Sequence, residues 1–205
     1  MGPRLRETRW EDRNFTPVIL RFVSLRDAEE IAAIYAPIVE TTAISFEAVA
    51  PDAAEMRSRI GSHPADKPWI VAENEGAISG YAYASTFRGR PAYRFGAEVT
   101  VYVAERARRG GVGRALYRAL MQLLTSQGYR RAFAGIALPN DGSVALHHAA
   151  GFTDAGVVHA AGFKFGRWHD VGFYECALAP LDVPPHDPVE VTALDLEVIR
   201  AAFAP

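Results

Sequence analysis

The sequence predicts a single α/β domain in which helices flank a mixed central β-sheet. Segments with the two-residue alternation of strands are interspersed with segments whose apolar residues recur at helical spacing. Near the middle of the chain, one strand passes into a helix through a turn rich in arginine and glycine, at residues 108–114. Helices and strands interspersed in this way are typical of an α/β architecture. A chain of 205 residues that is 49% hydrophobic is large enough for one domain with a sizeable core.

Composition divides the chain into three parts. Residues 1–17 are polar and irregular, so we expect an N-terminal arm there. The α/β domain is expected over residues 18–179. Residues 180–205 are rich in proline and acidic residues and form a C-terminal extension that is either partly disordered or carries a short helix at 194–203.

The N-terminal half is predicted to contain a strand, two helices, a short extended segment and a β-hairpin. Ser24 is a favourable N-cap residue for the first helix, and Pro37 is expected to kink or end that helix because proline lacks an N–H donor. Asn, Glu and Gly at 74–76 are typical of a hairpin turn. In order, the expected elements are strand 18–23, a helix from Ser24, extended residues 41–46, helix 52–60, and strands 69–73 and 77–85.

The central passage begins after a loop at 87–95. Residues 98–103 alternate between valine and larger polar or aromatic side chains, which predicts a strand with two different faces. From Val112 the apolar positions recur at helical spacing, and Gly128 is placed to end the helix. Because the first turn of a helix has free N–H groups and a partial positive charge, the arginines and glycines before it suit a phosphate group.

The C-terminal half is predicted to continue with a strand, a helix and two more strands. Gly151 is placed to close the helix. The expected elements are strand 131–138, a helix from 139–141 through Ala150, and strands 152–159 and 167–178 joined by a loop at 160–166.

Composition also bounds the function. A net charge of −2 gives no overall attraction to nucleic acid or to a membrane, and the arginines near residue 108 lack the interleaved aromatics of an RNA-binding patch. The single cysteine, Cys176, excludes an intrachain disulfide and is consistent with a reducing cytoplasm. No apolar stretch approaches membrane-spanning length. The scattered histidines and one cysteine provide no metal-binding set.

Two interpretations of the glycine-rich turn are open from its residues alone: a phosphate-binding loop, or an ordinary connection from strand to helix. The turn lacks the Lys-Ser or Lys-Thr pair of a Walker loop and the third glycine of the dinucleotide fingerprint, and glycines also serve ordinary turns. The pattern Arg108-x-x-Gly111-x-Gly113 resembles the pyrophosphate-binding motif of the GNAT acetyltransferases. That resemblance implies a mixed-sheet GNAT domain that uses acetyl-coenzyme A (acetyl-CoA) as cosubstrate.

Further segments narrow the resemblance to the phosphinothricin N-acetyltransferases and the related enzymes that acetylate methionine sulfoximine. The resemblance covers roughly residues 18–178, and it departs from the family in the arm, the extension and the doubled His147-His148. It implies a homodimer that acetylates the amino group of a small amino acid. The segments that carry it include Ile44-Ser-Phe-Glu47, Leu138-Pro-Asn-Asp141 and Trp168-His-Asp-Val-Gly-Phe173.

Two residues are the catalytic candidates. Glu98 matches the glutamate that the family uses as a general base, although a glutamate at this position is ordinarily exposed or salt-bridged. His147 matches a histidine that the family places near the active site, where it shares proton handling or orients the substrate. Its alternative role is that of a helix histidine satisfied by a neighbour. Tyr102 and Tyr117 are candidate acids, although most tyrosines in such a sheet serve packing.

The resemblance also assigns binding residues. Asn140 either caps its helix, binds the cofactor, or does both. Arginine pairs well with carboxylate or phosphinate groups, which suits a substrate with an anionic head. The acetyl-CoA candidates are Val101, Tyr102, Val103, Arg108, Arg109, Gly110, Gly111, Val112, Gly113, Arg114, Asn140 and Ser143. The substrate candidates are Phe46, Arg88, Arg90, Tyr93 and Lys164.

Two other functions remain open from the sequence. The first is the same acetyl transfer to another small amine or amino acid. A non-catalytic acetyl-CoA-binding module would bind the cofactor without turnover.

Overall fold

The computed structural model describes residues 18–182 and 184–204, so the arm expected at 1–17 lies outside the described residues. In this part of the chain, seven strands form one mixed sheet in the order β1-β2-β3-β4-β5-β7-β6. The strands are β1 (Ile19–Phe22), β2 (Trp69–Asn74), β3 (Ala77–Thr86), β4 (Gly96–Val103), β5 (Arg131–Ala137), β6 (Thr153–Lys164) and β7 (Arg167–Ala177). The α-helices are α1 (Ala28–Thr41), α2 (Ala53–Gly61), α3 (Val112–Gln127), α4 (Asp141–Ala149) and α5 (Leu196–Phe203).

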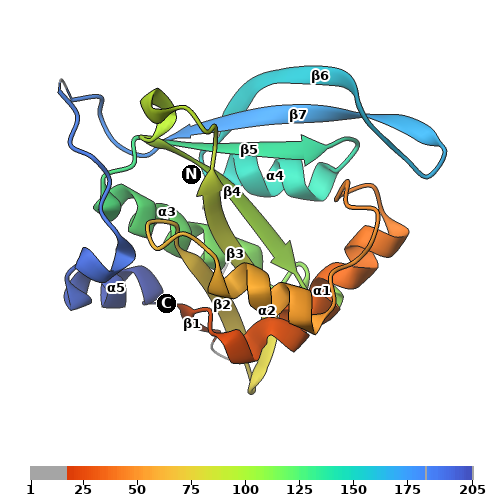
Figure 1. Ribbon diagram of the computed structural model, residues 1–205, viewed down its shortest axis with the longest axis horizontal. Coiled ribbons are helices and arrows are strands. Elements are labelled where there is room, and N and C mark those ends of the chain that lie inside the picture. The colour runs from red at the N-terminus through yellow and green to blue at the C-terminus, as the bar shows by residue number, and fades with distance from the viewer. Residues whose placement is uncertain (1–17, 183, 205) are drawn as a thin grey trace, which may run out of the picture.

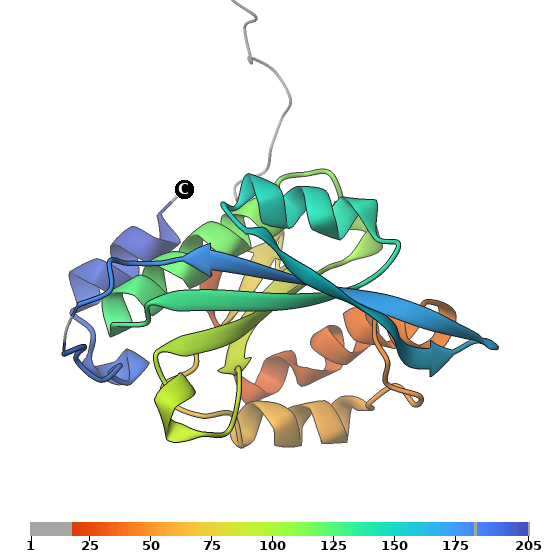
Figure 2. The same ribbon diagram turned by 90° about the horizontal axis from the view of Figure 1, so that it is seen from above.

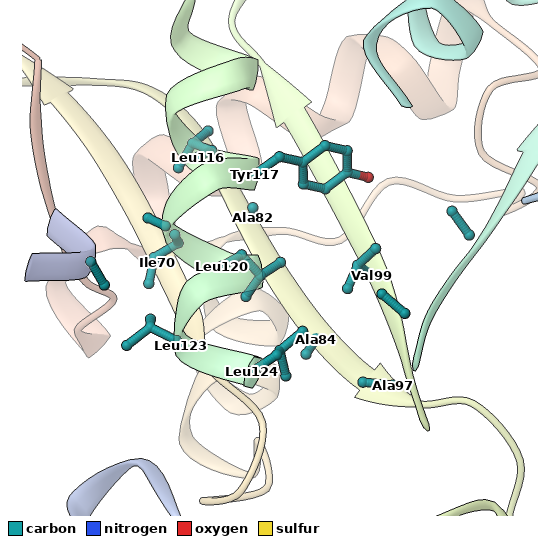
Figure 3. Close-up of a cluster of buried hydrophobic side chains, with 14 of the residues drawn as sticks. Ile70, Ala82, Ala84, Ala97, Val99, Leu116, Tyr117, Leu120, Leu123 and Leu124 are labelled. Carbon is teal, nitrogen blue, oxygen red and sulfur yellow. The ribbon is translucent and has the colours of Figure 1, made fainter. Parts of the chain in front are cut away.

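Helices cover both faces of the sheet, which confirms the predicted architecture. Helices α3, α4 and α5 lie on one side, and α1 and α2 lie on the other (Figures 1 and 2). The apolar stripe of α3 packs on strands β2, β3 and β4 and forms the larger core. Figure 3 shows this contact through Leu116, Leu120, Leu123, Leu124, Ile70, Ala82, Ala84, Ala97 and Val99.

The second core lies between α1 and the opposite face of the sheet. Ile31 and Tyr35 from α1 pack there with Val71 and Tyr81 from the sheet. Tyr102 on β4 packs against this core, whereas Val101 and Val103 pack against the larger one. The alternation of residues 98–103 therefore separates two different faces, as predicted.

Strands β4 and β5 are neighbours over only part of their length. They pair in parallel from Gly96 and Arg131 to Glu98 and Phe133, and beyond that pair they run apart (Figure 1). On its other edge β4 stays paired with β3 as far as Val103. The edge of β4 that faces β5 therefore has no strand partner after Glu98.

Three local predictions were wrong. Helix α1 does not end at Pro37 but continues to Thr41, because Ile38 and Val39 are buried in the second core and favour the helix over the cost of proline. Of residues 41–46, expected to be extended, Thr41 is the last residue of α1 and the others are irregular. Residues 160–164 belong to β6 rather than to a loop, because Gly162, Phe163 and Lys164 pair with β7 and leave a turn at 165–166.

The C-terminal extension follows the helical alternative. Ala202 on α5 is fully buried against the larger core. The ring of Phe203 meets that of Phe22 edge to face, at 5.0 Å between centroids. Upstream, the Val189 amide donates to the Gln127 carbonyl at 2.9 Å. The described extension is therefore packed along α3.

Candidate active site

Glu98 lies at the point where β4 and β5 begin to diverge. Its side chain is on the face of the sheet that α1 and α2 cover, since it alternates with the valines of the larger core. A Cβ atom on Gly135 of β5 would lie 3.8 Å from Glu98 Oε1. Burial raises the pKa of the Glu98 carboxyl above its ordinary value of 4.5. Among the described residues, none forms a hydrogen bond or an ion pair with this carboxyl. The alternative role of Glu98 as a salt-bridged glutamate therefore lacks the required partner.

His147 lies on the opposite face of the sheet, on α4. Its Nδ1 is 2.7 Å from the Ser143 carbonyl oxygen, and its Nε2 is 2.7 Å from the Tyr117 hydroxyl. Since a carbonyl only accepts, Nδ1 carries the proton, and Nε2 accepts from Tyr117. Burial lowers the pKa of His147, which favours this neutral form. The proton available between the two side chains is therefore the hydroxyl proton of Tyr117.

The pair lies close to the glycine-rich turn. Tyr117 is one helical turn beyond Gly113 on α3, and its ring projects from α3 across β4 in Figure 3. A Cβ atom on Gly113 would come within 2.9 Å of Leu146 and 3.5 Å of Val103. This glycine thus allows the start of α3, the end of β4 and helix α4 to approach one another.

The N-terminus of α3 is open and positively charged. Gly111 and Arg109 adopt left-handed conformations, with φ of 84° and 63°. No side chain caps the helix, and no acidic residue occupies its first turn. In the described chain, the side chains of Arg108, Arg109 and Arg114 are exposed and make no ion pair or hydrogen bond. The free amides and three unpaired guanidinium groups fit the pyrophosphate of a nucleotide cofactor.

The remaining cofactor candidates surround the same region. Val112 is buried at the start of α3, and Tyr102 places its ring 4.9 Å from that of Tyr35. Asn140 caps α4 by accepting from the Ser143 amide at 3.2 Å, which confirms the capping role. This cap occupies the amide oxygen of Asn140 and leaves its nitrogen for another partner.

Three of the substrate candidates lie in the loop before β4. The Arg88 guanidinium lies over the rings of Phe87 and Tyr93, at 5.2 and 5.7 Å from their centroids. Phe87 stacks on Phe133 at 3.8 Å, and Phe133 is the register partner of Glu98. The loop therefore begins beside the short pairing of β4 and β5 that ends at Glu98. Arg90 is exposed, within the same loop.

The other two candidates join separate elements. Phe46 packs over β6, where a Cβ atom on Gly162 would come within 2.3 Å of its ring. Lys164 Nζ donates to the carbonyls of Val39 and Ser45, at 2.6 and 2.7 Å. Two of the three donors of Lys164 are thus used to tie the β6–β7 hairpin to the segment after α1.

A polar network near Tyr102 was not predicted. The Tyr35 hydroxyl contacts Ser45 Oγ at 2.7 Å and Glu47 Oε1 at 3.0 Å. Glu47 accepts two hydrogen bonds from Arg59, at 2.8 and 3.1 Å, and this arginine holds the pKa of Glu47 below its ordinary value. Burial raises the pKa of Tyr35 to about 12. No sequence periodicity links these residues, because the irregular segment between α1 and α2 brings them together.

No helix in the ranges 18–182 and 184–204 has both the length and the apolar composition to cross a membrane. Across the same residues, no three His, Cys, Asp or Glu side chains gather closely enough to hold a metal ion.

Comparisons with known proteins agree with this geometry. The family profile described as "Acetyltransferase (GNAT) domain" matches residues 20–172. The phosphinothricin N-acetyltransferase of Streptomyces viridochromogenes is 38% identical over 178 residues, which cover 87% of this chain and 97% of that relative. The L-methionine sulfoximine/L-methionine sulfone acetyltransferase of Salmonella typhimurium is 32% identical and covers 78% of this chain and 94% of its own.

A solved structure gives the same result for the fold. The crystal structure of a GNAT superfamily phosphinothricin acetyltransferase from Sinorhizobium meliloti, in complex with AcCoA, aligns with a TM-score of 0.77 at 38% identity. The alignment covers 84% of this chain and 94% of that one. The profile match spans most of the chain, and the sequence and structural relatives agree with it. The chain therefore belongs to the GNAT acetyltransferase family.

Proposed function

We propose that this protein transfers the acetyl group of acetyl-CoA to the amino group of a phosphinothricin- or methionine sulfoximine-like amino acid. The observation that carries the proposal is the position of Glu98, an unpaired and half-buried carboxyl where β4 and β5 diverge. The names of the relatives support the substrate class.

The chain offers acetyl-CoA a continuous set of contacts. The amides and arginines of 108–114 hold the pyrophosphate, and the unpaired edge of β4 at 101–103 holds the pantetheine arm. The Asn140 nitrogen and Ser143 are within the same region of α4. When bound there, acetyl-CoA supplies a thioester carbonyl to the acceptor amine.

Glu98 removes a proton from the substrate ammonium group, directly or through one water. The nitrogen lone pair is then free for attack on the carbonyl carbon. A carboxyl with a raised pKa is a better base at neutral pH than an ordinary glutamate. Transfer is direct, because the single cysteine, Cys176, packs beside Gly151 against the larger core, on the face of the sheet opposite Glu98.

His147 acts through Tyr117. Tyr117 holds the proton shared by the pair, so this buried hydroxyl gives its proton to the departing thiolate as the C–S bond breaks, while His147 orients it. The second proton lost by the amine nitrogen restores the Tyr117 hydroxyl. The packing of the neighbouring Leu146 against Gly113 and Val103 supports a position beside the pantetheine arm.

The loop at 87–95 binds the anionic head of the substrate. Arg88, Arg90 and Tyr93 supply two guanidinium groups and a hydroxyl, which match a carboxylate or phosphinate. Phe46 and Lys164 border the substrate side from the segment after α1 and from the β6–β7 hairpin.

The protein forms a homodimer through β6. This edge strand is exposed over its first nine residues, its Val157 and Val158 expose 49% and 50% of their surface, and Trp168 of the adjoining β7 exposes 64%. An apolar edge strand of this kind favours a partner. The single cysteine suits a reducing compartment, which supports a cytoplasmic location.

Release of the coenzyme A thiol tests this function. The assay uses a panel of phosphinothricin, methionine sulfoximine, common amino acids and polyamines. We expect turnover on the first two compounds. Turnover on other amines alone would replace the substrate class, and acetyl-CoA binding without any turnover would leave only a binding module.

A further inference from the structure

The C-terminal extension contacts the loop that precedes β4. The extension lies beyond the matched family region, which ends at residue 172. The loop at 87–95 carries Arg88, Arg90 and Tyr93, to which the proposed function assigns the substrate's anionic head. This contact therefore joins a segment from outside the family domain to the proposed substrate site.

The extension is firmly attached to the body of the domain. Gln127 exchanges two hydrogen bonds with Val189, at 2.9 Å from the Val189 amide and 2.8 Å to its carbonyl. The Val191 amide donates to the Ala65 carbonyl at 3.3 Å, and Ala202 is fully buried. Asp187, two residues before Val189, is consequently held at a defined position beside the loop.

Two carboxylates of the extension hold the end of the loop. Asp187 Oδ1 lies 2.6 Å from Arg94 Nε, within the loop itself. Asp182 Oδ2 lies 2.5 Å from Arg130 Nη2, and the Arg130 amide donates to the Phe95 carbonyl at 2.8 Å. Arg130 therefore links Asp182 to the last residue of the loop.

A cavity of about 220 Å³ underlies the same loop. Its walls come from the loop, from the start of β5 and from the extension. The ring contacts of the loop centre on Phe87, which stacks on Phe133 and meets Tyr93 edge to face. Its first residue is held by the stacking of Phe87 on Phe133, whereas its end depends on polar contacts. The cavity is lined by residues that include Tyr93, Phe95, Phe133, Leu181 and Pro185.

We infer that Asp182 and Asp187 are positioning residues that fix the 87–95 loop and thereby set the affinity for the amine substrate. The inference rests on the proposed role of that loop. Because both ion pairs are partly exposed to solvent, their loss should raise the KM for the amine by about three- to tenfold rather than abolish activity.

The test compares the KM values of the two substrates in the full-length chain. Asp182→Asn with Asp187→Asn should raise the KM for the amine. The KM for acetyl-CoA and kcat at saturating amine should stay within about twofold, since the extension ion pairs do not touch the glycine-rich turn or Glu98. Asp182→Glu with Asp187→Glu retains both charges and should restore most of the amine affinity.

A matched control removes two acids from elsewhere in the extension. Glu190→Gln with Glu197→Gln leaves the loop contacts intact and should not change either KM. An unchanged KM for the amine in the Asp182/Asp187 variant would overturn the inference. Equal increases in both KM values, or the same effect in the control, would also overturn it.

Loop variants separate this inference from the proposed function. If Arg88→Ala and Tyr93→Phe raise the KM for the amine while the Asp182/Asp187 variant does not, the positioning role fails and the loop's role stands. If none of these variants changes that KM, the loop's role in substrate binding fails, and the inference fails with it.

Discussion

Burial changes the acid–base behaviour of Glu98 and His147 in the direction that keeps each neutral. It raises the pKa of the Glu98 carboxyl and lowers that of the His147 imidazole. Their surroundings otherwise differ. Glu98 lacks a polar partner in the described chain, whereas both ring nitrogens of His147 have one. Glu98 is therefore suited to accept a proton, and His147 is suited to hold Tyr117 in place.

The raised pKa of Glu98 predicts an effect on stability with a definite sign. The folded state binds this proton more tightly than the unfolded chain, so the favourable contribution is complete below the ordinary pKa of 4.5. It is lost as pH rises through the folded-state pKa. Relative to the wild type, Glu98→Gln should gain stability between pH 4 and pH 8 in urea unfolding.

Glu190→Gln serves as the control for that measurement, because Glu190 is an exposed carboxylate of the extension. If the pH dependence of Glu98→Gln matched that of this control, burial would not govern the Glu98 carboxyl.

The Tyr117–His147 hydrogen bond predicts coupled effects. Tyr117→Phe leaves His147 Nε2 buried without a donor, which should cost about 1–3 kcal/mol of unfolding free energy. If Tyr117 serves the departing thiolate, kcat should also fall by about a hundredfold. Unfolding and kinetics of Tyr117→Phe, His147→Asn and the double variant test this. Additive losses would show that the two side chains act independently.

At the scale of elements, the site depends on close approach between α3, β4 and α4. Gly113 is the residue that allows it, because any side chain there would meet Leu146 and Val103. The same turn leaves the α3 amides free of side-chain caps. The same short segment must therefore both allow close packing and leave amides free for the cofactor.

Gly113→Val is expected to raise the KM for acetyl-CoA by at least about tenfold, because the added atoms displace Leu146 from the start of α3. Overpacking of this kind typically costs about 1–3 kcal/mol of stability. Gly142→Ala on α4 is the matched control, since nothing lies within 4 Å of its added Cβ atom. We expect that control to keep its cofactor affinity and to gain helix stability. Unchanged acetyl-CoA affinity in Gly113→Val would remove the turn from the cofactor site.

The elements themselves were largely predictable, whereas their pairing was not. Alternation at 98–103 and helical spacing from Val112 follow from local chemistry, and the structure confirms both elements. The divergence of β4 from β5 depends on two strands that are separated along the chain by helix α3. No local sequence pattern therefore predicts it. Residues 160–164 are small or mixed in character, and pairing with β7 makes them a strand. The Glu47–Arg59 contact likewise depends on tertiary structure.

At the scale of the whole molecule, the sheet ends in a long and exposed strand. The extension covers α3 near the other end of the fold, and β6 remains open (Figure 2). An exposed apolar edge is a ready surface for pairing with another chain. The proposed homodimer would bury this edge.

Val158→Lys with Trp168→Glu should shift the protein from dimer to monomer in light scattering after size exclusion. Buried charge at a strand edge opposes pairing. Leu196→Glu is the control, because Leu196 exposes 67% of its surface on α5, at the other end of the fold. A wild-type protein that is already monomeric would contradict the proposed interface.

The pH dependence of kcat/KM for phosphinothricin, measured for the wild type and Glu98→Gln, tests the central claim most directly. For the wild type, we predict an acidic limb that titrates above pH 4.5, because burial raises the pKa of the base. For Glu98→Gln, we predict that kcat/KM falls by about a hundredfold and that the acidic limb disappears. The KM for acetyl-CoA should not change. A variant that retained both its rate and its acidic limb would show that Glu98 is not the base.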